Sequence, residues 1–384
     1  MNVAKLFATA VAFGSFQGCV LVMTVVHNTP DLDDYLIFDN RVVATTQAPS
    51  PLRTLSRVPE FMAQLQVPAE DGTIHKLSRY LEDTLTVAFV VMRNDRIVYE
   101  RYALGYDDRS LLNSFSIAKS IVATLVGIAV SEGRLQLDGT VSMYRPDFVG
   151  TPYGSVTLRS LLTMTSGMAD APSYLPGRAQ FYYGDDLRDV LARSAPESRS
   201  GSGWRYSEAD VQMLGFVLEA ATGKQVSAYL AEKLWKPLGM ESPALWALDR
   251  EGGIEKTFCC ISARARDFAR FGRLYLDTGR WNDKQLVPAE WAARTVLHGI
   301  RTKDGYLHQH LWWTPPGGQG DFYAYGHNGQ YVYLNPASRT VIVMFSVKNR
   351  QDPLPMFREV AMALSSPANL AEIERVDAMS IKLH

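Results

Sequence analysis

The chain carries the stretch Leu85-Thr86-Val87-Ala88-Phe89-Val90-Val91-Met92, then the turn pair Asn94-Asp95, and then Ile97-Val98-Tyr99-Glu100-Arg101-Tyr102. Both stretches are rich in β-branched and aromatic residues, which favour strands. Two such stretches on either side of a short turn predict a β-hairpin. An antiparallel sheet is therefore expected to begin here.

The C-terminal part of the chain predicts further strands of the same kind. Residues 322–325, 330–334 and 340–347 alternate in hydropathy or run apolar. Asn335-Pro336 separates the last two runs as a turn. A helix is expected to follow, from about residue 354 to residue 364.

The middle of the chain has a helical pattern. Ile117 to Val130 is apolar almost all round, which is typical of a helix buried on every side. Val211 to Ala221 ends at Gly223, and glycine commonly stops a helix.

These patterns together predict an α+β domain, in which an antiparallel sheet is flanked by helices and carries an inserted, mostly helical region. The sheet is expected from about residues 59–115 and 256–384, and the helical region from about 116–255. The expected division of the whole chain is a signal anchor or lipoprotein signal over 1–27, a tether over 28–58, and the domain over 59–384.

The composition is that of an ordinary globular protein, since 47% of the 384 residues are hydrophobic and 21% are charged. The 39 Lys and Arg nearly balance the 40 Asp and Glu, so no basic surface predicts a nucleic-acid partner. A small neutral or zwitterionic substrate fits this balance better than a polyanion.

Cysteine is sparse, with Cys19, Cys259 and Cys260 alone in the sequence. This number excludes a disulfide framework, and no spacing resembles a zinc site, so we expect no metal and no cofactor. A bond between the adjacent Cys259 and Cys260 would close a strained ring. We therefore expect these two residues to be small buried hydrophobes.

The N-terminus predicts export. Leu6 to Val26 is an unbroken uncharged run after Lys5 and before Asp31, and as a helix it would cross a bilayer core of about 30 Å. Because the cation precedes the run and acids follow it, the bulk of the chain is expected outside the cytoplasm. The expected location is membrane-anchored and extracytoplasmic, and periplasmic in a Gram-negative bacterium.

Two modes of anchoring compete. Phe16-Gln17-Gly18-Cys19 is similar to a bacterial lipobox, in which the cysteine is lipidated. Phe and Gln are poor residues for that motif and the apolar run continues past Cys19, so an uncleaved anchor is favoured. A buried N-terminal core helix is the third interpretation. Pro30, Pro49 and Pro51 indicate that residues 28–58 form a tether.

Ser116-Ile117-Ala118-Lys119 places a hydroxyl and an amine three residues apart at the start of the predicted buried helix. Positions i and i+3 share a helix face, so the Lys119 nitrogen can reach the Ser116 oxygen. A serine nucleophile needs a neighbouring base, and burial is expected to lower the pKa of Lys119 toward that task. The alternative is an exposed capping serine beside a surface lysine, because chance matches to Ser-x-x-Lys are common.

Two further segments favour a catalytic Ser116–Lys119 pair over a capping serine beside a surface lysine. Trp204-Arg205-Tyr206-Ser207-Glu208 opens a helix, and Tyr325-Gly326-His327-Asn328-Gly329-Gln330 lies between two predicted strands. With the three segments in this order, the chain resembles the class C β-lactamase and penicillin-recognising serine hydrolase family. The motifs of that family are Ser-x-x-Lys, Tyr-x-Asn or a variant, and Lys-Thr-Gly or His-x-Gly.

The resemblance runs from about residue 80 to residue 365. Val156 to Met168, which ends in Thr-Ser-Gly-Met, and Asp267 to Leu274 are also typical of the family. The chain is most similar to the branch of 6-aminohexanoate-dimer hydrolases and carboxylesterases.

The resemblance implies a β-lactamase/transpeptidase-like fold and a role for each motif residue. Ser116 attacks a carbonyl to form an acyl-enzyme, while Lys119 and Tyr206 share the proton transfer, one as base and one as relay. The backbone N–H groups of Ser116 and Gln330 hold the oxyanion.

The same resemblance makes the His-x-Gly stretch a binding element. His327 stands where relatives place Lys, near the substrate carboxylate, and its alternative is a half-buried strand histidine. Asn328 belongs to the same substrate-binding stretch. Gly329 is expected to let the strand approach the substrate closely.

One residue departs from the family pattern. Glu208 stands where many relatives carry an amide, and an anion there could repel a carboxylate of a β-lactam or a cell-wall peptide. It could instead pair with a cation of the substrate or with Lys119.

Other features carry less weight. The spacing of His308-Gln309-His310 puts both imidazoles on one strand face, as a possible metal pair without a third ligand. Tyr174 and Phe181-Tyr182-Tyr183 line the cleft or pack in the core, and residues 169–186 read as a loop. The absence of Gly-x-Ser-x-Gly from the sequence argues against an ordinary α/β-hydrolase.

The sequence therefore predicts a serine hydrolase that cleaves a small ester or amide. The alternatives are a cell-wall DD-peptidase or β-lactamase, and a non-catalytic membrane-tethered binding module of the same fold. Retention of Ser116, Lys119 and Tyr206 argues against the binding module, which has no need of all three.

Overall fold

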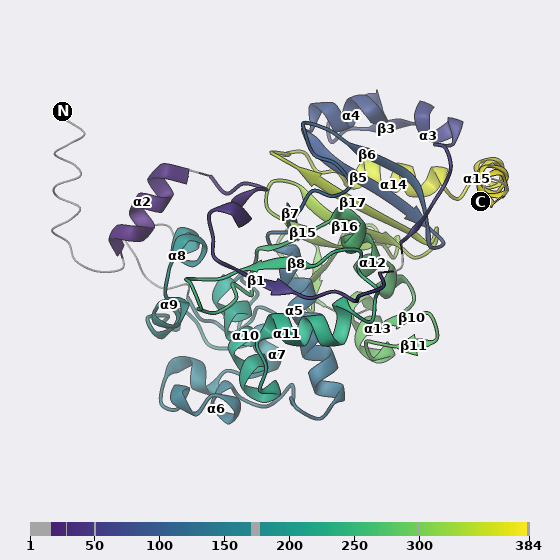
Figure 1. Ribbon diagram of the computed structural model, residues 1–384. Coiled ribbons are helices and arrows are strands. Elements are labelled where there is room, and N and C mark those ends of the chain that lie inside the picture. The colour runs from purple at the N-terminus through teal and green to yellow at the C-terminus, as the bar shows by residue number, and fades with distance from the viewer. Residues whose placement is uncertain (1–16, 28, 50, 170–176, 298, 382–384) are drawn as a thin grey trace, which may run out of the picture.

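The computed structural model describes residues 17–27, 29–49, 51–169, 177–297 and 299–381. Its largest unit is a nine-stranded sheet with the strand order β12-β13-β14-β15-β16-β17-β5-β6-β2 (Figure 1). The strands are β2 (Arg53–Thr54), β5 (Thr86–Arg93), β6 (Arg96–Tyr102), β12 (Ile300–Arg301), β13 (Leu307–Gln309), β14 (Trp312–Thr314), β15 (Phe322–Gly326), β16 (Gln330–Asn335) and β17 (Thr340–Ser346).

Strands from the two ends of the domain meet in this sheet. β5 and β6 form the predicted hairpin, with Ala88 opposite Tyr102. β17 lies antiparallel to β5, with Met344 opposite Phe89. The predicted α+β architecture, with one sheet built from both ends of the chain, is confirmed.

The sheet separates two hydrophobic cores, because successive side chains of a strand point to opposite faces. Ala88 and Val90 of β5 belong to the larger core, whereas Phe89 and Val91 belong to the smaller one. Helix α12 (Ala265–Leu276) packs on the first face against β16 and β17. Helices α4 (Leu77–Asp83) and α14 (Leu354–Ala363) cover the second face (Figure 1). The helix expected over 354–364 is thus confirmed.

The inserted region is helical, as predicted. Its helices are α5 (Ile117–Ser131), α6 (Val141–Tyr144), α7 (Leu158–Leu162), α8 (Gly177–Tyr183), α9 (Leu187–Ala192), α10 (Glu208–Thr222) and α11 (Val226–Leu230). Helix α5 is buried from Ile117 to Ala129, which confirms the helix expected from the apolar run. Helix α10 packs against α5 and ends at Gly223, whose φ of 67° is the left-handed conformation that stops a helix.

Smaller elements complete the fold. A four-stranded sheet has the order β1-β8-β9-β7, and two strand pairs, β3–β4 and β10–β11, stand apart from it. Their bounds are β1 (Asn40–Val43), β3 (Gln66–Pro68), β4 (Ile74–Lys76), β7 (Leu112–Asn113), β8 (Ala244–Ala247), β9 (Ile261–Ala263), β10 (Arg280–Trp281) and β11 (Lys284–Gln285). The remaining helices are α2 (Gln17–His27), α3 (Glu60–Gln64), α13 (Ala289–Leu297) and α15 (Pro367–Ile381).

The tether expected over residues 28–58 is wrong for the described residues of that segment. β1 pairs with β8, β2 extends the large sheet beside β6, and Leu32 and Val43 are buried. The partners of these short strands lie elsewhere in the chain, so no local pattern signals them. The folded domain therefore begins well before residue 59.

Helix α2 covers the second half of the uncharged N-terminal run, and residues 1–16 lie outside the described residues. It packs against α8 and buries Val20, while Val25 and Val26 are exposed. Among the residues that the structure describes, no helix has the length and apolar character needed to cross a bilayer.

The loop expected over 169–186 contains helix α8, so that expectation is wrong for 177–183. Phe181, Tyr182 and Tyr183 are buried, and the Tyr182 hydroxyl donates a hydrogen bond of 2.6 Å to Asp34. These aromatic side chains pack in the core, the second of the two expected placements. Tyr174 lies outside the described residues.

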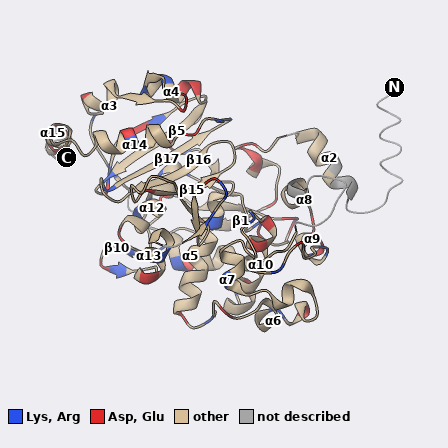
Figure 2. Ribbon diagram, turned by 180° about the vertical axis from the view of Figure 1, so that it is seen from behind, with Lys and Arg blue, Asp and Glu red and all other residues tan. Residues whose placement is uncertain are grey.

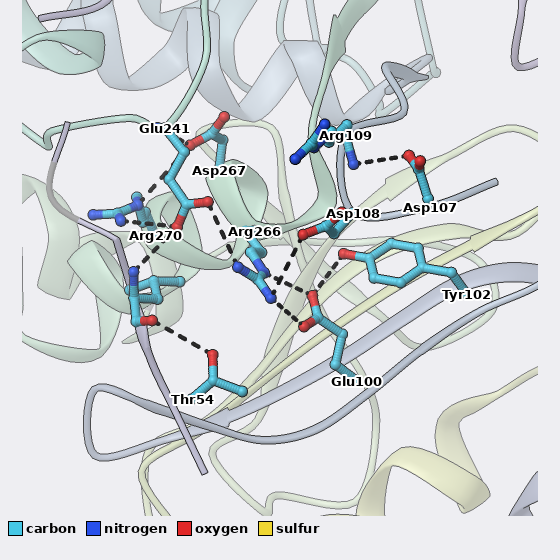
Figure 3. Close-up of polar contacts among 11 residues, drawn as sticks. Thr54, Glu100, Tyr102, Asp107, Asp108, Arg109, Glu241, Arg266, Asp267 and Arg270 are labelled. Carbon is cyan, nitrogen blue, oxygen red and sulfur yellow. Dashed lines mark hydrogen bonds and ion pairs between the residues drawn. The ribbon is translucent and has the colours of Figure 1, made fainter. Parts of the chain in front are cut away.

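Charged residues of both signs are interspersed along the chain (Figure 2). Figure 3 shows a network of them where several segments meet. Arg266 of α12 donates to Glu100 of β6 at 2.6 and 2.8 Å. Glu241 accepts from Arg270 of α12 and from the backbone N–H of Leu52, both at 3.1 Å. The network thus fastens the N-terminal segment and the sheet to α12.

Asp267 is the buried acid of this network, with no exposed surface. Its Oδ1 accepts the backbone N–H of Glu241 at 2.7 Å. Burial raises the pKa of Asp267 to about 7. Because the folded value exceeds the unfolded one, the folded state binds the extra proton, and this stabilisation is lost as the pH rises through about 7.

We expect Asp267→Asn to weaken the pH dependence of stability. Asparagine cannot ionise and keeps the Oδ1 acceptor, so the variant should lose less free energy of unfolding than the wild type between mildly acidic and mildly alkaline pH. Urea unfolding at both ends of this range measures the difference. Asp283→Asn, at an exposed position between β10 and β11, is the control. Equal pH dependence in wild type and Asp267→Asn would contradict the assignment.

Candidate active site

Ser116 and Lys119 lie one helical turn apart at the start of α5, as predicted. The Lys119 Nζ donates to the Ser116 Oγ at 2.8 Å. Ser116 is the N-cap residue of α5, but its side chain makes no capping hydrogen bond. The lysine is buried, with 2% of its side chain exposed. The alternative of a capping serine beside a surface lysine is therefore wrong.

The Lys119 ammonium has three acceptors from three parts of the chain. Besides Ser116, it donates to Glu208 Oε2 at 2.5 Å and to the backbone carbonyl of Phe258 at 2.6 Å. An ammonium group has three N–H donors, and the Tyr206 side chain also interacts with this one. No sequence pattern marks Phe258, because a backbone carbonyl is common to every residue.

The charge state of Lys119 differs from the expectation. Burial acts to lower the pKa of Lys119, but the negative charge of Glu208, with a further contribution from Tyr206, outweighs burial and raises it above its usual value. The expected lowering of the Lys119 pKa by burial is therefore wrong for this site. The resting lysine is a cation.

Glu208 has found a partner inside the site. Its carboxylate pairs with Lys119, and 12% of its side chain is exposed. Of the alternatives that the sequence leaves open, pairing with Lys119 is the one observed. The pair carries no net charge, so Glu208 repels a substrate carboxylate less than an unpaired anion would.

Tyr206 lies over the same lysine. Lys119 Nζ is 4.9 Å from the centre of the Tyr206 ring, which stacks on Trp313 at 6.3 Å. Ser207, in an extended conformation just before α10, caps that helix, because its side chain accepts the N–H of Asp210. This hydrogen bond fixes the backbone next to Tyr206. Burial raises the pKa of Tyr206, while the charge of Lys119 acts in the opposite direction. The structure thus brings the three motif residues expected from sequence into one cluster.

The hairpin turn between β15 and β16 forms another side of the site. His327 is exposed, and its ring meets Phe115, the neighbour of Ser116, edge to face at 5.9 Å. Asn328 donates from its side chain to the carbonyl of Pro30 at 3.1 Å. The N-terminal segment therefore lies beside the turn.

Gly329 and Gln330, at the end of the same turn, contact the end of β17 and the chain after it. A Cβ at Gly329 would meet the Asn349 side chain at 2.6 Å, so this glycine makes room for the chain after β17. The Gln330 side chain is buried and bonds to both backbone groups of Ser346. Gly326 lies close to the segment before Ser116, because a Cβ there would meet the Ser114 carbonyl oxygen at 2.3 Å.

Aromatic residues that carry no motif surround Tyr206. The rings of Trp204 and Trp313 contact each other at 5.6 Å, and the His308 ring contacts both, at 5.5 and 4.8 Å. Burial, followed by the charge of Lys119, lowers the pKa of His308 to about 3, so this imidazole is neutral. No sequence pattern predicts this aromatic cluster, since three separate segments of the chain supply its members.

The histidine pair expected on one strand face is wrong. β13 ends at Gln309, and His310 follows with a φ of 47°. His310 stacks on Trp291 at 4.0 Å, whereas His308 packs against Trp204 and Trp313. The two imidazoles therefore face different surroundings.

Cys259 and Cys260 are buried, as expected, but they form a disulfide, which corrects the expectation of free thiols. The Cys259 carbonyl accepts from the indole N–H of Trp246, and the Cys260 carbonyl from the N–H of Ala247, both at 3.1 Å. The bridged pair directly follows Phe258, so it lies next to the carbonyl that holds Lys119.

The sheet, the helical insert and the Ser–Lys–Tyr cluster together have the arrangement of the penicillin-recognising serine hydrolase fold. Residues 74–365 match the Beta-lactamase family model, and the chain belongs to that family. Members of the family are serine hydrolases with amidase, esterase or carboxypeptidase activity. The predicted family and fold are confirmed.

Two curated proteins illustrate the range of relatives. The 6-aminohexanoate-dimer hydrolase of Paenarthrobacter ureafaciens is 27% identical over 70% of this chain and 74% of its own length. Esterase EstB of Burkholderia gladioli is 37% identical over 39% of this chain and 44% of its own length.

Solved structures agree in fold. A Bacillus anthracis protein provisionally named as a 6-aminohexanoate-dimer hydrolase has a TM-score of 0.72 and 25% identity, with 90% of each chain covered. A class C β-lactamase has a TM-score of 0.56 and 19% identity, with 76% of this chain and 94% of that one covered.

We expect Glu208→Gln to make Ser116 reactive at lower pH. The substitution removes the negative charge that raises the pKa of Lys119, so the free amine should form at a pH lower by about one unit or more. The measurement is the rate at which a fluorophosphonate labels Ser116 from neutral to alkaline pH, followed by intact mass. Glu208→Asp keeps the charge and is the matched control. An unchanged pH midpoint in Glu208→Gln would show that Glu208 does not set the charge of Lys119.

Proposed function

We propose that this protein hydrolyses small esters or amides through an acyl-enzyme on Ser116. The observation that carries the proposal is the 2.8 Å contact between Lys119 Nζ and a Ser116 hydroxyl that caps no helix. The relatives named as an amide-dimer hydrolase and an esterase support the same type of reaction.

In this proposal Lys119 is the base once it has lost its proton. Its free amine takes the proton of Ser116 as the serine oxygen bonds to the substrate carbonyl carbon, and Tyr206 relays a proton to the leaving group as the ester or amide bond breaks. Because Glu208 raises the pKa of Lys119, the free amine becomes abundant only at alkaline pH. Activity should therefore rise toward alkaline pH.

The oxyanion needs two donors in fixed positions. One is the backbone N–H of Ser116 at the N-terminal end of α5, where the helix dipole favours negative charge. The second comes from the hairpin turn, for which the sequence predicts Gln330. The close contact of Gly326 with the Ser114 carbonyl favours the N–H of His327, the next residue, for this role.

We expect Ser116→Ala to abolish hydrolysis of short p-nitrophenyl esters, because the variant lacks the nucleophile. Steady-state rates for wild type and variant measure this, and the rate in buffer alone is the baseline. Intact mass after exposure to a fluorophosphonate, a penicillin and a p-nitrophenyl ester reports which acyl groups attach. Wild-type turnover by Ser116→Ala would refute the assignment.

We also propose export with retention at a membrane through the N-terminal segment. The support is the uncharged run from Leu6 to Val26 and the exposed valines Val25 and Val26 of α2. The small-molecule substrate would then be met outside the cytoplasm.

We expect the full-length protein to partition with membranes and a variant lacking residues 1–27 to be released. The deletion spares Pro30, whose carbonyl binds Asn328 of the site. Cys19→Ser distinguishes the anchors, since loss of a lipid mass indicates a lipoprotein and unchanged retention a spanning helix. Recovery of the full-length chain in the soluble cytoplasmic fraction would contradict export.

A further inference from the structure

A groove of about 640 Å³ opens beside the hairpin turn of the site. His327 and Asn328 line its near end, and the tyrosines Tyr306, Tyr323, Tyr325 and Tyr331 line its wall. A volume of this order is typical of small-molecule sites, which span roughly 300–1,000 Å³. The groove is therefore large enough for a substituent of a substrate bound at Ser116.

The tyrosine wall is continuous with the catalytic cluster. Tyr206 stacks on Trp313, Trp313 meets Tyr306 at 6.1 Å, and Tyr306 meets Tyr323 at 6.5 Å. Tyr331 then contacts Tyr323 at 5.5 Å and Tyr325 at 5.0 Å. A path of ring contacts thus leads from the catalytic tyrosine into the groove.

Part of this wall is accessible to a ligand. Tyr325 is 37% exposed, although it lies at the end of a central strand of the sheet. Tyr306, Tyr323 and Tyr331 are half-buried. Tyrosine rings present an apolar body with a polar tip and favour edge-to-face or offset contact with other rings.

Charge in the groove is nearly balanced. Asp31, Glu70 and Asp352 face Lys348 and Arg350 around it. All three acids already accept a backbone N–H of the fold: Asp31 that of Leu32, Glu70 that of Asp352, and Asp352 that of Leu354 at the start of α14. This balance favours a ligand without a net charge.

We propose that the groove binds an uncharged aromatic arm of the substrate, remote from the bond that is cleaved. The inference rests on the proposed hydrolysis at Ser116 and adds the class of substrate. The arm lies against the tyrosine wall, and its ring makes the edge-to-face contacts that these side chains favour.

The test varies the arm of an ester while the rest of the molecule stays the same. Methyl acetate and methyl 4-phenylbutyrate differ in the acyl arm, and methyl acetate and 3-phenylpropyl acetate differ in the alcohol arm. Tyr325→Ala should lower kcat/KM for the aryl ester of at least one pair by about fivefold. The short esters should stay within about twofold of wild type, because they do not reach the groove.

Tyr144→Ala is the control, since this half-buried tyrosine belongs to α6 and does not line the groove. It should leave the ratio of aryl to short ester unchanged. If Tyr325→Ala alters aryl and short esters by the same factor in both pairs, the groove proposal is overturned. Turnover of the short esters that Ser116→Ala abolishes would still support the proposed function in that case.

Binding decides the matter if no ester is turned over, an outcome that would count against the proposed function. Saturation-transfer NMR of 4-phenylbutyramide with the Ser116→Ala protein should show transfer to the ring protons. The Ser116→Ala/Tyr325→Ala double variant should reduce that transfer, while butyramide, which has no ring, should show little in either protein. Equal transfer in both proteins, or none to the ring, would overturn the groove proposal.

Discussion

The buried ammonium of Lys119 is the interaction on which the geometry of the site depends. A charge can be buried only when hydrogen-bond partners replace its water, and Lys119 has three of them. They come from α5 through Ser116, from the start of α10 through Glu208, and from the segment before β9 through Phe258. Removing one partner of a buried ion pair typically costs about 3–5 kcal/mol, because the other charge is left uncompensated. The lysine therefore ties α5 to the segments that carry Glu208 and Phe258.

Two of these partners are fixed to each other by the fold. Gln212 of α10 donates to the carbonyl of Glu255 and accepts the N–H of Thr257, both at 3.0 Å. The Thr257 hydroxyl also donates to the carbonyl of Val211. Helix α10 thus carries Glu208 at its first turn and holds the segment of Phe258 along its second. The distance between the two acceptors is set by the helix, and Lys119 enters a site that is already formed.

Much of this arrangement follows from local patterns in the sequence. The apolar run after Ser116 predicted a buried helix, and Ser-x-x-Lys predicted which groups meet, because both depend on residues within one or two helical turns. The hairpin from Thr86 to Tyr102 was predictable for the same reason. The strands near residues 40 and 53 were not predictable in this way. The first pairs with residues 244–247, far along the chain, and the second lies parallel to residues 96–97, a pairing that no local pattern signals.

The charge of Lys119 also depends on residues far apart in the sequence, so local patterns do not predict it. The apolar helix correctly predicted burial, and burial alone lowers a lysine pKa. The pKa of Lys119 depends on Glu208, which lies 89 positions further along the chain. Only the tertiary fold brings the Glu208 carboxylate to 2.5 Å from the Lys119 Nζ. Likewise, Gly329 and Gly326 are both glycines beside the motif. Only the packing of Gly326 against Ser114 and of Gly329 against Asn349 tells which one lies close to the segment before Ser116.

Glu208 also changes where substrate discrimination can arise. A carboxylate paired at 2.5 Å with a buried lysine presents little net field to an incoming group, so the reacting centre itself distinguishes charges weakly. Selection between substrates then depends on the surfaces around the reacting centre, where the side chains are partly exposed and chemically varied. On one side these are the turn of His327 and Asn328 with the N-terminal segment bound to it through Pro30. On the other they are the rings that lead from Trp313 to Tyr306. A site of this construction keeps its proton chemistry fixed by buried charges, and it can vary its substrates by changing the surrounding rings and turns without disturbing that chemistry.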